Sequence, residues 1–413
     1  MHKLDIVVNF DRLKSDLLEL SKIGRREDNG IYRPAFSEDD FTARNWLLEK
    51  IKHSGLSGRM DQAGNVFGRL QGDNDEAAVL CGSHLDTVPG GGALDGALGV
   101  IVALESLRRI KELDLKHSHP LEMIGFSDEE GRFGGSLGSQ AVAGHLDREK
   151  IETASDLNGV TLLDAMAARG LNGHEILKAT RESRSIRNFL ELHIEQGPVL
   201  EEKQKNIGLV ETVVGLFKWR CVFRGQADHA GTTPMPMRRD ALRGLSAFIN
   251  QIDLLLEKHG SPDSVLTVGR VELTPGSANV VPGEVFFSLD VRDRSDALLH
   301  GLQLNIEKTL KTIASQHRLD FEYEKLSLIQ PVNCSTGLTN MLEKLATEMG
   351  LSTHRMVSGA AHDAQMMAKI APVAIVFVPS VNGRSHSPLE YTNWADIENG
   401  ANLTLRALLE MSR

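Results

Sequence analysis

Two adjacent glutamates, Glu129 and Glu130, are the residues of this sequence whose placement points most directly to chemistry. They follow the apolar run from Met123 to Phe126, which is typical of a buried strand, and they precede a glycine. Neighbouring carboxylates repel each other, so such a pair is most stable where a cation lies beside it. A glutamate pair alone also fits a solvated loop, and a metal site needs further ligands.

Several other segments supply imidazole and carboxylate groups. His84 and Asp86 lie two residues apart at the end of an apolar run, Asp95 lies in a glycine-rich turn, and His193 and His386 follow or end two further apolar runs. These groups are the ligands of hydrolytic metal centres. A metal-bound histidine gives its second ring proton to a carboxylate or carbonyl, and we expect the Asp86 side chain to accept that of His84. Each segment alone fits a loop or helix cap, but together they predict a metal-dependent hydrolase.

The elements that must position these side chains alternate between strand and helix in the first half of the chain. Apolar runs predict strands over residues 77–81, 121–126 and 188–194, and helical periodicity predicts a helix over 96–110. Strands that alternate with helices predict an α/β sheet, in which chemistry lies at the carboxyl ends of the strands.

The middle of the chain has a different order of elements, β-α-β-β-α-β, which is typical of a ferredoxin-like unit. We expect strands at 217–224, 265–273, 284–292 and 320–326, and helices at 240–258 and 296–316. After residue 337 the pattern returns to helix and buried strand, including a strand at 373–378. The sequence therefore predicts a catalytic α/β domain with a mixed sheet, residues 1–211 and 329–413, interrupted by a small inserted domain, residues 212–328, for which the resemblance described below implies a lid and dimerisation role.

Composition limits the partners and the compartment. A chain of 413 residues with 41% hydrophobic and 25% charged residues suggests a globular protein of two domains. Its net charge of -10 argues against a nucleic acid or an anionic membrane as partner. No apolar run approaches the ~18 residues of a membrane span. The three widely spaced cysteines and the charged N-terminal segment, which lacks a signal-peptide core, favour reduced thiols and a cytoplasmic protein.

Six ordered motifs resemble one family of hydrolases. The sequence is similar to the N-carbamoyl-L-amino-acid hydrolase, β-ureidopropionase and allantoate amidohydrolase family, within the dinuclear aminoacylase/carboxypeptidase-type metallopeptidase clan. The resemblance extends from about Phe10 to Leu409. The motifs are Gly82-Ser83-His84-Leu85-Asp86-Thr87, Gly91-Gly92-Ala93-Leu94-Asp95-Gly96, Asp128-Glu129-Glu130-Gly131, Glu191-Leu192-His193-Ile194-Glu195-Gln196-Gly197, His229-Ala230-Gly231-Thr232-Thr233-Pro234-Met235 and Ser358-Gly359-Ala360-Ala361-His362-Asp363.

The resemblance implies two divalent metal ions in one site. His84, Asp95 and His193 would hold one ion, and Asp95, Glu130 and His386 would hold the other, with Asp95 as the bridge. Three protein ligands for each ion leave a position for a shared water, as a catalytic site requires. Zinc is the default for these ligands, but nitrogen and oxygen ligands also suit manganese, cobalt or nickel.

The resemblance also implies the catalytic groups. Glu129, beside a ligand but not itself one, would take a proton from the water and return it to the leaving nitrogen. Asp86 would support this centre through His84. His229 would come from the inserted domain, reach the partner subunit's site and stabilise the oxyanion, which implies a homodimer.

The same resemblance implies contacts to a small ureido substrate. Arg292 and Asn279 of the inserted domain, and Gln196 and His362 of the catalytic domain, would contact it. The planar guanidinium of Arg292 suits bidentate capture of a carboxylate. Because these groups lie on different domains, we expect closure of one domain on the other to assemble the site.

One position bears on the substrate. Allantoate-cleaving relatives tend to carry glutamine at the position of Leu216, and an apolar residue cannot hydrogen-bond a second ureido group. We therefore expect cleavage of N-carbamoyl-L-amino acids to the amino acid, CO2 and ammonia. The alternatives are an allantoate or ureidoglycolate amidohydrolase, a peptidase of the clan, disfavoured by His193 where those enzymes tend to be acidic, and a binding protein, which would be expected to lack Glu129 or a ligand.

Overall fold

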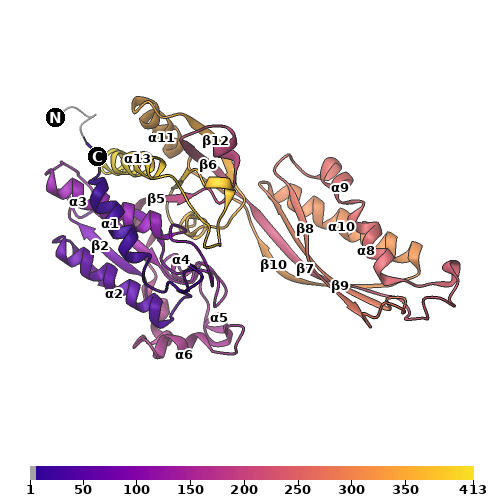
Figure 1. Cartoon of the computed structure of the whole chain (residues 1–413). Helices are drawn as coiled ribbons and strands as arrows, with labels where there is room; N and C mark the ends of the chain where they lie inside the picture. The colour runs from indigo at the N-terminus through magenta and orange to yellow at the C-terminus, as the bar shows by residue number, and fades with distance from the viewer. Residues whose placement is uncertain (1–5) are drawn as a thin grey trace. The chain divides into compact units, whose positions relative to one another are not determined.

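The computed structural model of the chain describes residues 6–413. The N-terminal segment from which a cytoplasmic protein was predicted begins with residues 1–5, and these five residues lie outside the described part of the chain. The chain forms two compact units: a larger unit of Met1–Glu211 with Cys334–Arg413, and an inserted unit of Thr212–Asn333 (Figure 1). The sequence analysis placed the end of the insertion at residue 328. The inserted unit continues to Asn333, because Val332 and Asn333 pair with Val213 and Thr212, where this unit begins.

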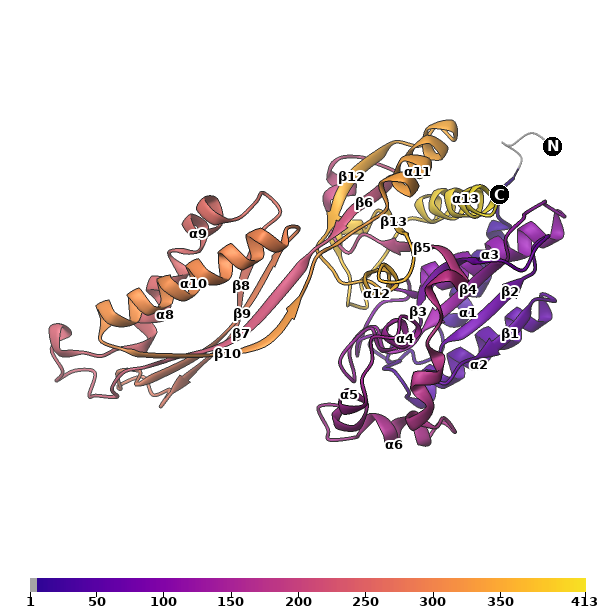
Figure 2. The same ribbon diagram turned by 180° about the vertical axis from the view of Figure 1, so that it is seen from behind.

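Among the described residues, the larger unit is built on a mixed sheet of nine strands, of which β11 and the last residues of β6 belong to the inserted unit. Its path runs β1-β2-β4-β3-β5-β13-β6-β11, and β12 pairs with β6 off this path (Figure 2). The strands are β1 (Ser57–Met60), β2 (Val66–Leu70), β3 (Ala78–His84), β4 (Leu121–Phe126), β5 (Ile186–Ile194), β6 (Ile207–Val213), β11 (Val332–Asn333), β12 (Thr353–Ser358) and β13 (Val373–Val378).

The centre of this sheet is parallel. β3 pairs in parallel with β4 and with β5, and β13 pairs in parallel with β5. β3, β4 and β13 are buried along their whole length, which accounts for their largely apolar sequences. The carboxyl ends of these four neighbouring strands therefore meet at one edge of the sheet.

Helices cover the sheet of the larger unit. The helix that follows β3, α3 (Ala97–Glu112), is buried at every residue from Ala97 to Arg108 and packs on β3, β4 and β5. The others are α1 (Phe10–Leu20), α2 (Glu38–His53), α4 (Leu137–Val142), α5 (Arg148–Thr153), α6 (Leu162–Ala167), α7 (Val199–Glu202), α11 (Thr336–Glu348), α12 (Asp363–Met367) and α13 (Trp394–Met411), with 3-10 segments η2 (Gly173–Ala179), η3 (Ser183–Ser185) and η5 (Val381–Gly383).

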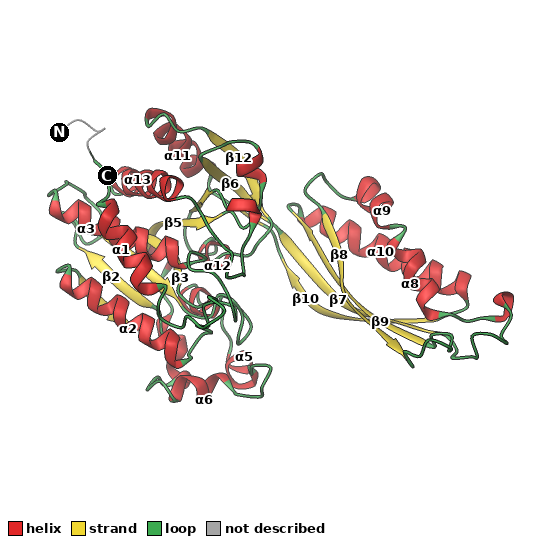
Figure 3. Cartoon of the chain, in the orientation of Figure 1, coloured by secondary structure: helices red, strands yellow, loops and turns green. Residues whose placement is uncertain are grey.

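The inserted unit has an antiparallel sheet of order β10-β7-β9-β8, with helices on one face (Figure 3). Its elements are β7 (Gly215–Arg224), η4 (Met235–Met237), α8 (Ala241–Ile249), α9 (Ile252–His259), β8 (Val265–Thr274), β9 (Glu284–Asp293), α10 (Asp296–His317) and β10 (Asp320–Ile329). The order β-α-β-β-α-β is the predicted one, but the single helix expected over 240–258 is wrong. The first helix, α8, ends at Ile249; the backbone N–H of Gln251 then bonds to Phe248 at the shorter, three-residue spacing, and α9 begins at Ile252.

Two further findings concern the composition. Cys81, Cys221 and Cys334 are all free and buried. Among residues 6–413, no helix combines the length and the apolar character needed to cross a bilayer.

Candidate metal centre

Four neighbouring strands each bring one candidate ligand to the same edge of the sheet. His84 is the last residue of β3 and is in register with Phe126, where β4 ends, four residues before Glu130. His193 lies in β5 and is in register with Phe377 of β13, the strand that precedes His386. Following the sheet order β4-β3-β5-β13, the candidates are Glu130, His84, His193 and His386.

Asp95, directly before α3, lies between two groups of these side chains. Its Oδ1 is 3.5 Å from His84 Nε2 and 3.2 Å from His193 Nε2. Its Oδ2 is 3.5 Å from His386 Nε2, which is 3.3 Å from Glu130 Oε2. The ligand atoms within each group lie within 4.8 Å of one another. The structure thus brings together the two three-residue groups that the resemblance implies, each on its own oxygen of Asp95.

The orientation of the two buried histidines fits a metal ion. His84 Nδ1 lies 3.0 Å from the main-chain oxygen of Asp86, and His193 Nδ1 lies 2.9 Å from that of Ile194. A carbonyl can only accept, so Nδ1 carries a proton in each ring, and Nε2 is the nitrogen that faces Asp95 and would bind a cation. Imidazole ligands in metal sites have this arrangement. The expectation that the Asp86 carboxylate accepts the proton of His84 is wrong, because its Oδ1 is 4.0 Å away.

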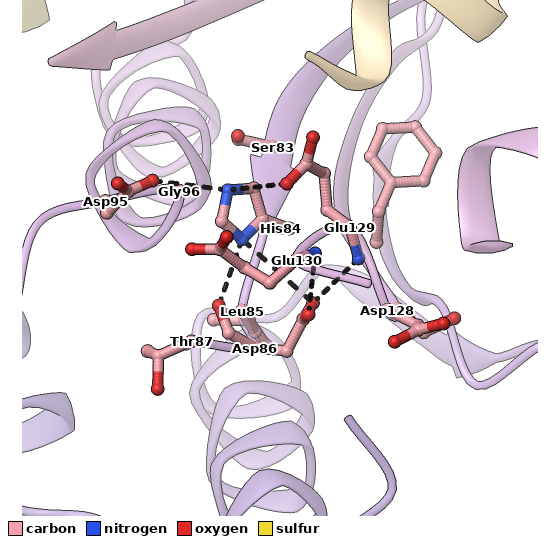
Figure 4. A network of polar contacts seen from close by, with 12 residues as sticks. Ser83, His84, Leu85, Asp86, Thr87, Asp95, Gly96, Asp128, Glu129 and Glu130 are labelled. Carbon is pink, nitrogen blue, oxygen red and sulfur yellow. Dashed lines mark hydrogen bonds and ion pairs between the residues drawn. The ribbon is translucent and has the colours of Figure 1, made fainter. Parts of the chain in front are cut away.

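The Asp86 carboxylate instead holds the glutamate pair. It accepts hydrogen bonds from the backbone N–H of Glu129 at 3.2 Å and of Glu130 at 3.1 Å (Figure 4). One buried carboxylate therefore fixes the turn after β4 that carries both glutamates. Asp86 is a positioning residue for the glutamates, and its main chain positions His84.

Gly96 is required beside this cluster. Its φ of 65° lies in the left-handed region, and an added Cβ would lie 2.4 Å from Cε1 of His84. Its backbone N–H donates to His193 Nε2 at 3.1 Å. A larger residue at this position would displace one of the two buried histidines.

Glu129 stands next to the groups but belongs to neither of them. Its Oε2 lies 3.8 Å from His84 Nε2, and its side chain is 10% exposed. Burial, together with the negative charges of Asp363 and Glu130, raises the pKa of Glu129 well above its usual range, although His84 acts in the opposite direction. A carboxyl with a raised pKa beside the ligands, and not among them, has the position of a general base.

Asp95 and Glu130, the two carboxyls that would bind cations, have pKa values shifted in opposite directions. Burial opposes ionisation of Asp95, but His193 and His84 hold its pKa well below the ordinary value. Burial and the charge of Asp95 raise the pKa of Glu130 to about 8. In the absence of cations, Asp95 is therefore ionised and Glu130 is largely protonated at neutral pH.

Two residues that the sequence analysis missed support Asp95. Ser385 Oγ donates to Asp95 Oδ2 at 2.6 Å and lies 3.1 Å from Glu390 Oε2. Glu390 Oε1 accepts the backbone N–H groups of Leu94 and Asp95 at 2.9 and 3.0 Å. Their positions close to His386 were the one sign in the sequence that could have drawn attention to them. Nothing in the sequence indicates that they contact Asp95.

Glu191 was also missed, although it is an acidic residue in an apolar strand, two positions before His193 and so on the same face. Its carboxylate accepts from Ser83 Oγ at 2.6 Å and from the backbone N–H of Ala364 at 3.0 Å. Glu191, His193 and His362 form a third group close enough to hold a cation. Because Glu191 is bonded in this way, and because His362 Nε2 lies 2.9 Å from Ser358 Oγ, we interpret this group as support for His193.

The two substrate candidates of the larger unit lie beside these ligands. Gln196 has a φ of 60° and donates its side-chain N–H to Asp95 Oδ2 at 2.8 Å. His362 is 2% exposed, and its ring packs edge-on against that of His193 with centroids 4.8 Å apart. Gln196 therefore faces the centre, whereas His362 is buried behind His193.

The three candidates of the inserted unit are described within that unit. His229 is exposed and pairs through an isolated bridge with Val280, next to Asn279, whose main-chain oxygen accepts from Ala230 at 2.9 Å. Arg292 binds Asp290 through Nε and Nη2, at 2.8 and 3.1 Å. His229 and Asn279 thus lie in neighbouring loops, and the guanidinium of Arg292 already contacts a carboxylate.

Comparison with known proteins now defines the class. Residues 80–410 match the model of peptidase family M20/M25/M40, and the chain belongs to this family. It is a hydrolase that acts on carbon–nitrogen bonds.

Individual relatives are similar over almost their whole length. An N-carbamoyl-L-amino-acid amidohydrolase of Paenarthrobacter aurescens is 36% identical, with 98% of each chain covered. An allantoate amidohydrolase of Bacillus subtilis is 35% identical, with 96% of each covered. The crystal structure of an amidase of the hydantoinase/carbamoylase family from Burkholderia multivorans matches with a TM-score of 0.92 at 34% identity, again with 98% of each chain covered.

The raised pKa of Glu130 leads to a prediction for metal binding. Below pH 8 a cation must displace the proton of Glu130, and the raised pKa values of His84 and His193 add protons to be displaced, so affinity should rise with pH from 6 to 8. The expected gain is up to ~10-fold per pH unit for each proton displaced. Chelator competition with Zn²⁺ or Mn²⁺ at pH 6, 7, 8 and 8.5 measures this. A dissociation constant that stays the same from pH 6 to 8 would contradict it.

The hydrogen bonds of Ser385 and Glu390 lead to a second prediction. Ser385→Ala and Glu390→Ala should each weaken metal binding by ~10–100-fold, because supports behind a ligand have this effect. Glu390→Gln keeps an oxygen for the two backbone N–H groups and should cost less. Ser387→Ala, in the same loop, is the matched control and should bind metal as the wild type does. Unchanged affinity in Ser385→Ala and Glu390→Ala would show that the pair does not hold Asp95.

Proposed function

We propose that the protein hydrolyses the ureido group of N-carbamoyl-L-amino acids to the amino acid, CO2 and ammonia at a dinuclear metal centre. The observation that carries the proposal is the arrangement of two ligand groups on the two oxygens of Asp95, with Glu129 next to them but in neither. His84, Asp95 and His193 would hold one ion, and Asp95, Glu130 and His386 the other. Zinc is the first choice for these ligands, with manganese, cobalt and nickel as alternatives.

The chemistry then divides between the cations and the side chains. Divalent cations at these ligands would supply a Lewis acid for the ureido carbonyl and lower the pKa of water. Glu129 would accept the proton of the attacking water and deliver it to the leaving nitrogen. Asp86 keeps Glu129 in place through the backbone N–H group. Burial of Glu129 favours proton transfer, because its raised pKa makes the ionised carboxylate a stronger base.

The choice of substrate rests on the inserted unit. Leu216 on β7 is buried and in register with Arg292 on β9. Arg292 would bind the α-carboxylate in exchange for, or together with, its contact to Asp290, and Asn279 would assist it. Leu216 offers no hydrogen bond to a second ureido group, which favours N-carbamoyl amino acids over allantoate. Allantoate or ureidoglycolate remains the second candidate, because a relative of similar identity is an allantoate amidohydrolase.

His229 has the tautomer of a hydrogen-bond donor. Its Nδ1 accepts the backbone N–H groups of Gly231 and Thr232 at 3.0 and 3.2 Å, so the proton of the neutral ring lies on Nε2. A donor of this kind could stabilise the oxyanion formed at the ureido carbon. We propose that it acts in the partner's site of a homodimer. The edge strands β8 and β10, which expose Val265, Leu326 and Leu328, support such an association.

A substrate comparison tests the proposed function. Ammonia release from N-carbamoyl-L-amino acids, N-carbamoyl-β-alanine and allantoate, compared by kcat/KM, should favour the first class. Glu129→Gln should keep both metal ions but lower kcat by ~10²–10⁴, the usual effect of losing acid–base catalysis. Asp95→Ala should lose both ions by elemental analysis. Preference for allantoate would overturn the substrate assignment, and loss of metal in Glu129→Gln would overturn the role of Glu129.

The proposed role of His229 predicts complementation between inactive variants. If His229 acts in the partner's site, a heterodimer of His229→Ala and Glu129→Gln has one intact site and one site with both changes. Equal mixing gives about half heterodimer, so activity should recover to about a quarter of wild type after subunit exchange. Native mass spectrometry confirms the exchange, and ammonia release measures the recovery.

The matched control combines two changes in the larger unit. Glu129→Gln mixed with His193→Ala leaves a defect in each site of the heterodimer and should recover no activity. If exchange occurs and the His229→Ala mixture also stays inactive, His229 acts within its own subunit or outside the reaction.

A further inference from the structure

A cavity of about 560 Å³ in the larger unit adjoins the candidate centre. One wall is formed by Glu130, a candidate ligand, and by the segment Asp86–Pro89 after β3. The facing residues come from 156–169, a segment that contributes no candidate ligand. The volume lies within the range of small-molecule sites, ~300–1,000 Å³.

The far wall is tied to the segment of Glu130. Arg132, two residues after Glu130, donates from Nε and Nη2 to Asp156 Oδ2 at 3.1 and 2.9 Å, and from Nη1 to the main-chain oxygen of Ala35 at 2.7 Å. The other oxygen of Asp156 accepts the backbone N–H groups of Asn158 and Val160 at 2.9 and 3.0 Å. The wall that begins at Asp156 is therefore held at a fixed position relative to Glu130.

The lining is largely apolar. Phe36, Val88, Val160, Ala165 and Ala168 contribute to it, and Leu157 contributes although its side chain is fully exposed. A single exposed leucine is ordinary on a protein surface. This one lies at a cavity beside a candidate ligand, on a turn fixed by Asp156. A ligand group in the cavity would remove its side chain from water, which favours an apolar occupant.

Most charged groups of the lining are engaged within the protein. Asp86 binds two backbone N–H groups, Arg132 binds Asp156, and Asp164 Oδ2 accepts from Thr161 Oγ1 at 2.7 Å. Arg169 also lines the cavity; its buried Nε has no hydrogen-bond partner among the described residues, and the flat face of its guanidinium can stack on an aromatic ring. The apolar lining and the face of this guanidinium together suit an apolar, and in particular an aromatic, group.

We propose that this cavity is the subsite for the amino-acid side chain, so that the protein prefers N-carbamoyl-L-amino acids with bulky apolar side chains, aromatic ones above all. The inference rests on the proposed function. A ureido group that reacts beside Glu130 carries two substituents on its carbonyl: an NH2 group, which is far too small for the cavity, and the amino acid. The side chain of that amino acid is the part of the substrate that matches the size and polarity of the lining.

The small residues Ala165 and Ala168 keep the cavity open, and Ala168 gives a direct test. Ala168 is exposed at the end of α6, so Ala168→Trp should fold while its side chain occupies the cavity. It should lower kcat/KM for N-carbamoyl-L-phenylalanine by ~10-fold or more relative to N-carbamoylglycine, which has no side chain to place. Ala167→Trp, exposed on the same helix but outside the lining, is the matched control and should leave this ratio unchanged. Leu157→Ser should raise KM for the phenylalanine substrate and leave the glycine substrate unaffected.

The outcomes separate this inference from the proposed function. A wild-type ratio that favours phenylalanine over glycine, and that falls in Ala168→Trp alone of the two tryptophan variants, supports the subsite. If N-carbamoyl amino acids are hydrolysed but the ratio does not respond to Ala168→Trp and Leu157→Ser, or if N-carbamoyl-L-glutamate is preferred, the apolar subsite is wrong while the proposed function stands. If wild type releases ammonia from no N-carbamoyl amino acid, both are wrong.

Discussion

The two carboxylate oxygens of Asp95 contact different sets of side chains, and the rest of the larger unit depends on this constraint. Oδ1 faces His84 and His193, whereas Oδ2 faces His386 and accepts from Gln196 and Ser385. A buried carboxylate in contact with so many polar groups must be held firmly, because a small rotation would exchange one set of partners for the other. Its position directly before the fully buried start of α3 provides that rigidity.

Buried carboxylates hold the main chain of the proposed catalytic carboxylates in two places. Asp86 accepts the backbone N–H groups of Glu129 and Glu130, and Glu390 accepts those of Leu94 and Asp95. Because only backbone N–H groups are used, the side chains of Glu129, Glu130 and Asp95 stay available for a proton or a metal ion. The arrangement also concentrates negative charge, and burial together with Asp95 raises the pKa of Glu390 to about 7. Cations at the centre would relieve this repulsion, since every one of these carboxyls lies near the proposed ligands.

The sequence predicted the parts of this design that depend on local patterns. The apolar runs before Glu129 and around His193 form strands, as predicted, because a strand that is buried on both faces is largely apolar. The proposed ligands then meet because parallel strands bring their carboxyl ends to one edge. The contacts of Ser385 and Glu390 to the segment of Asp95 could not be read in this way, because they join positions almost 300 residues apart. The proton partner of His84 was mispredicted for a related reason: the carboxylate of Asp86 is drawn away by two backbone N–H groups of a distant turn.

The order of the strands also explains why the two ligand groups differ. The inner strands β3 and β5 supply His84 and His193 from within the strands themselves, and with Asp95 this group is fully buried. The outer strands β4 and β13 are separated by both inner strands, at ~4.8 Å for each step across the sheet. Glu130 and His386 reach Asp95 from loops beyond the strand ends, and His386 requires a left-handed backbone, with a φ of 53°, to do so. The side chain of His386 stays 50% exposed. The outer group would therefore be the open side of the proposed centre, and the cavity beside Glu130 adjoins this side, where a substrate could approach without displacing the buried histidines.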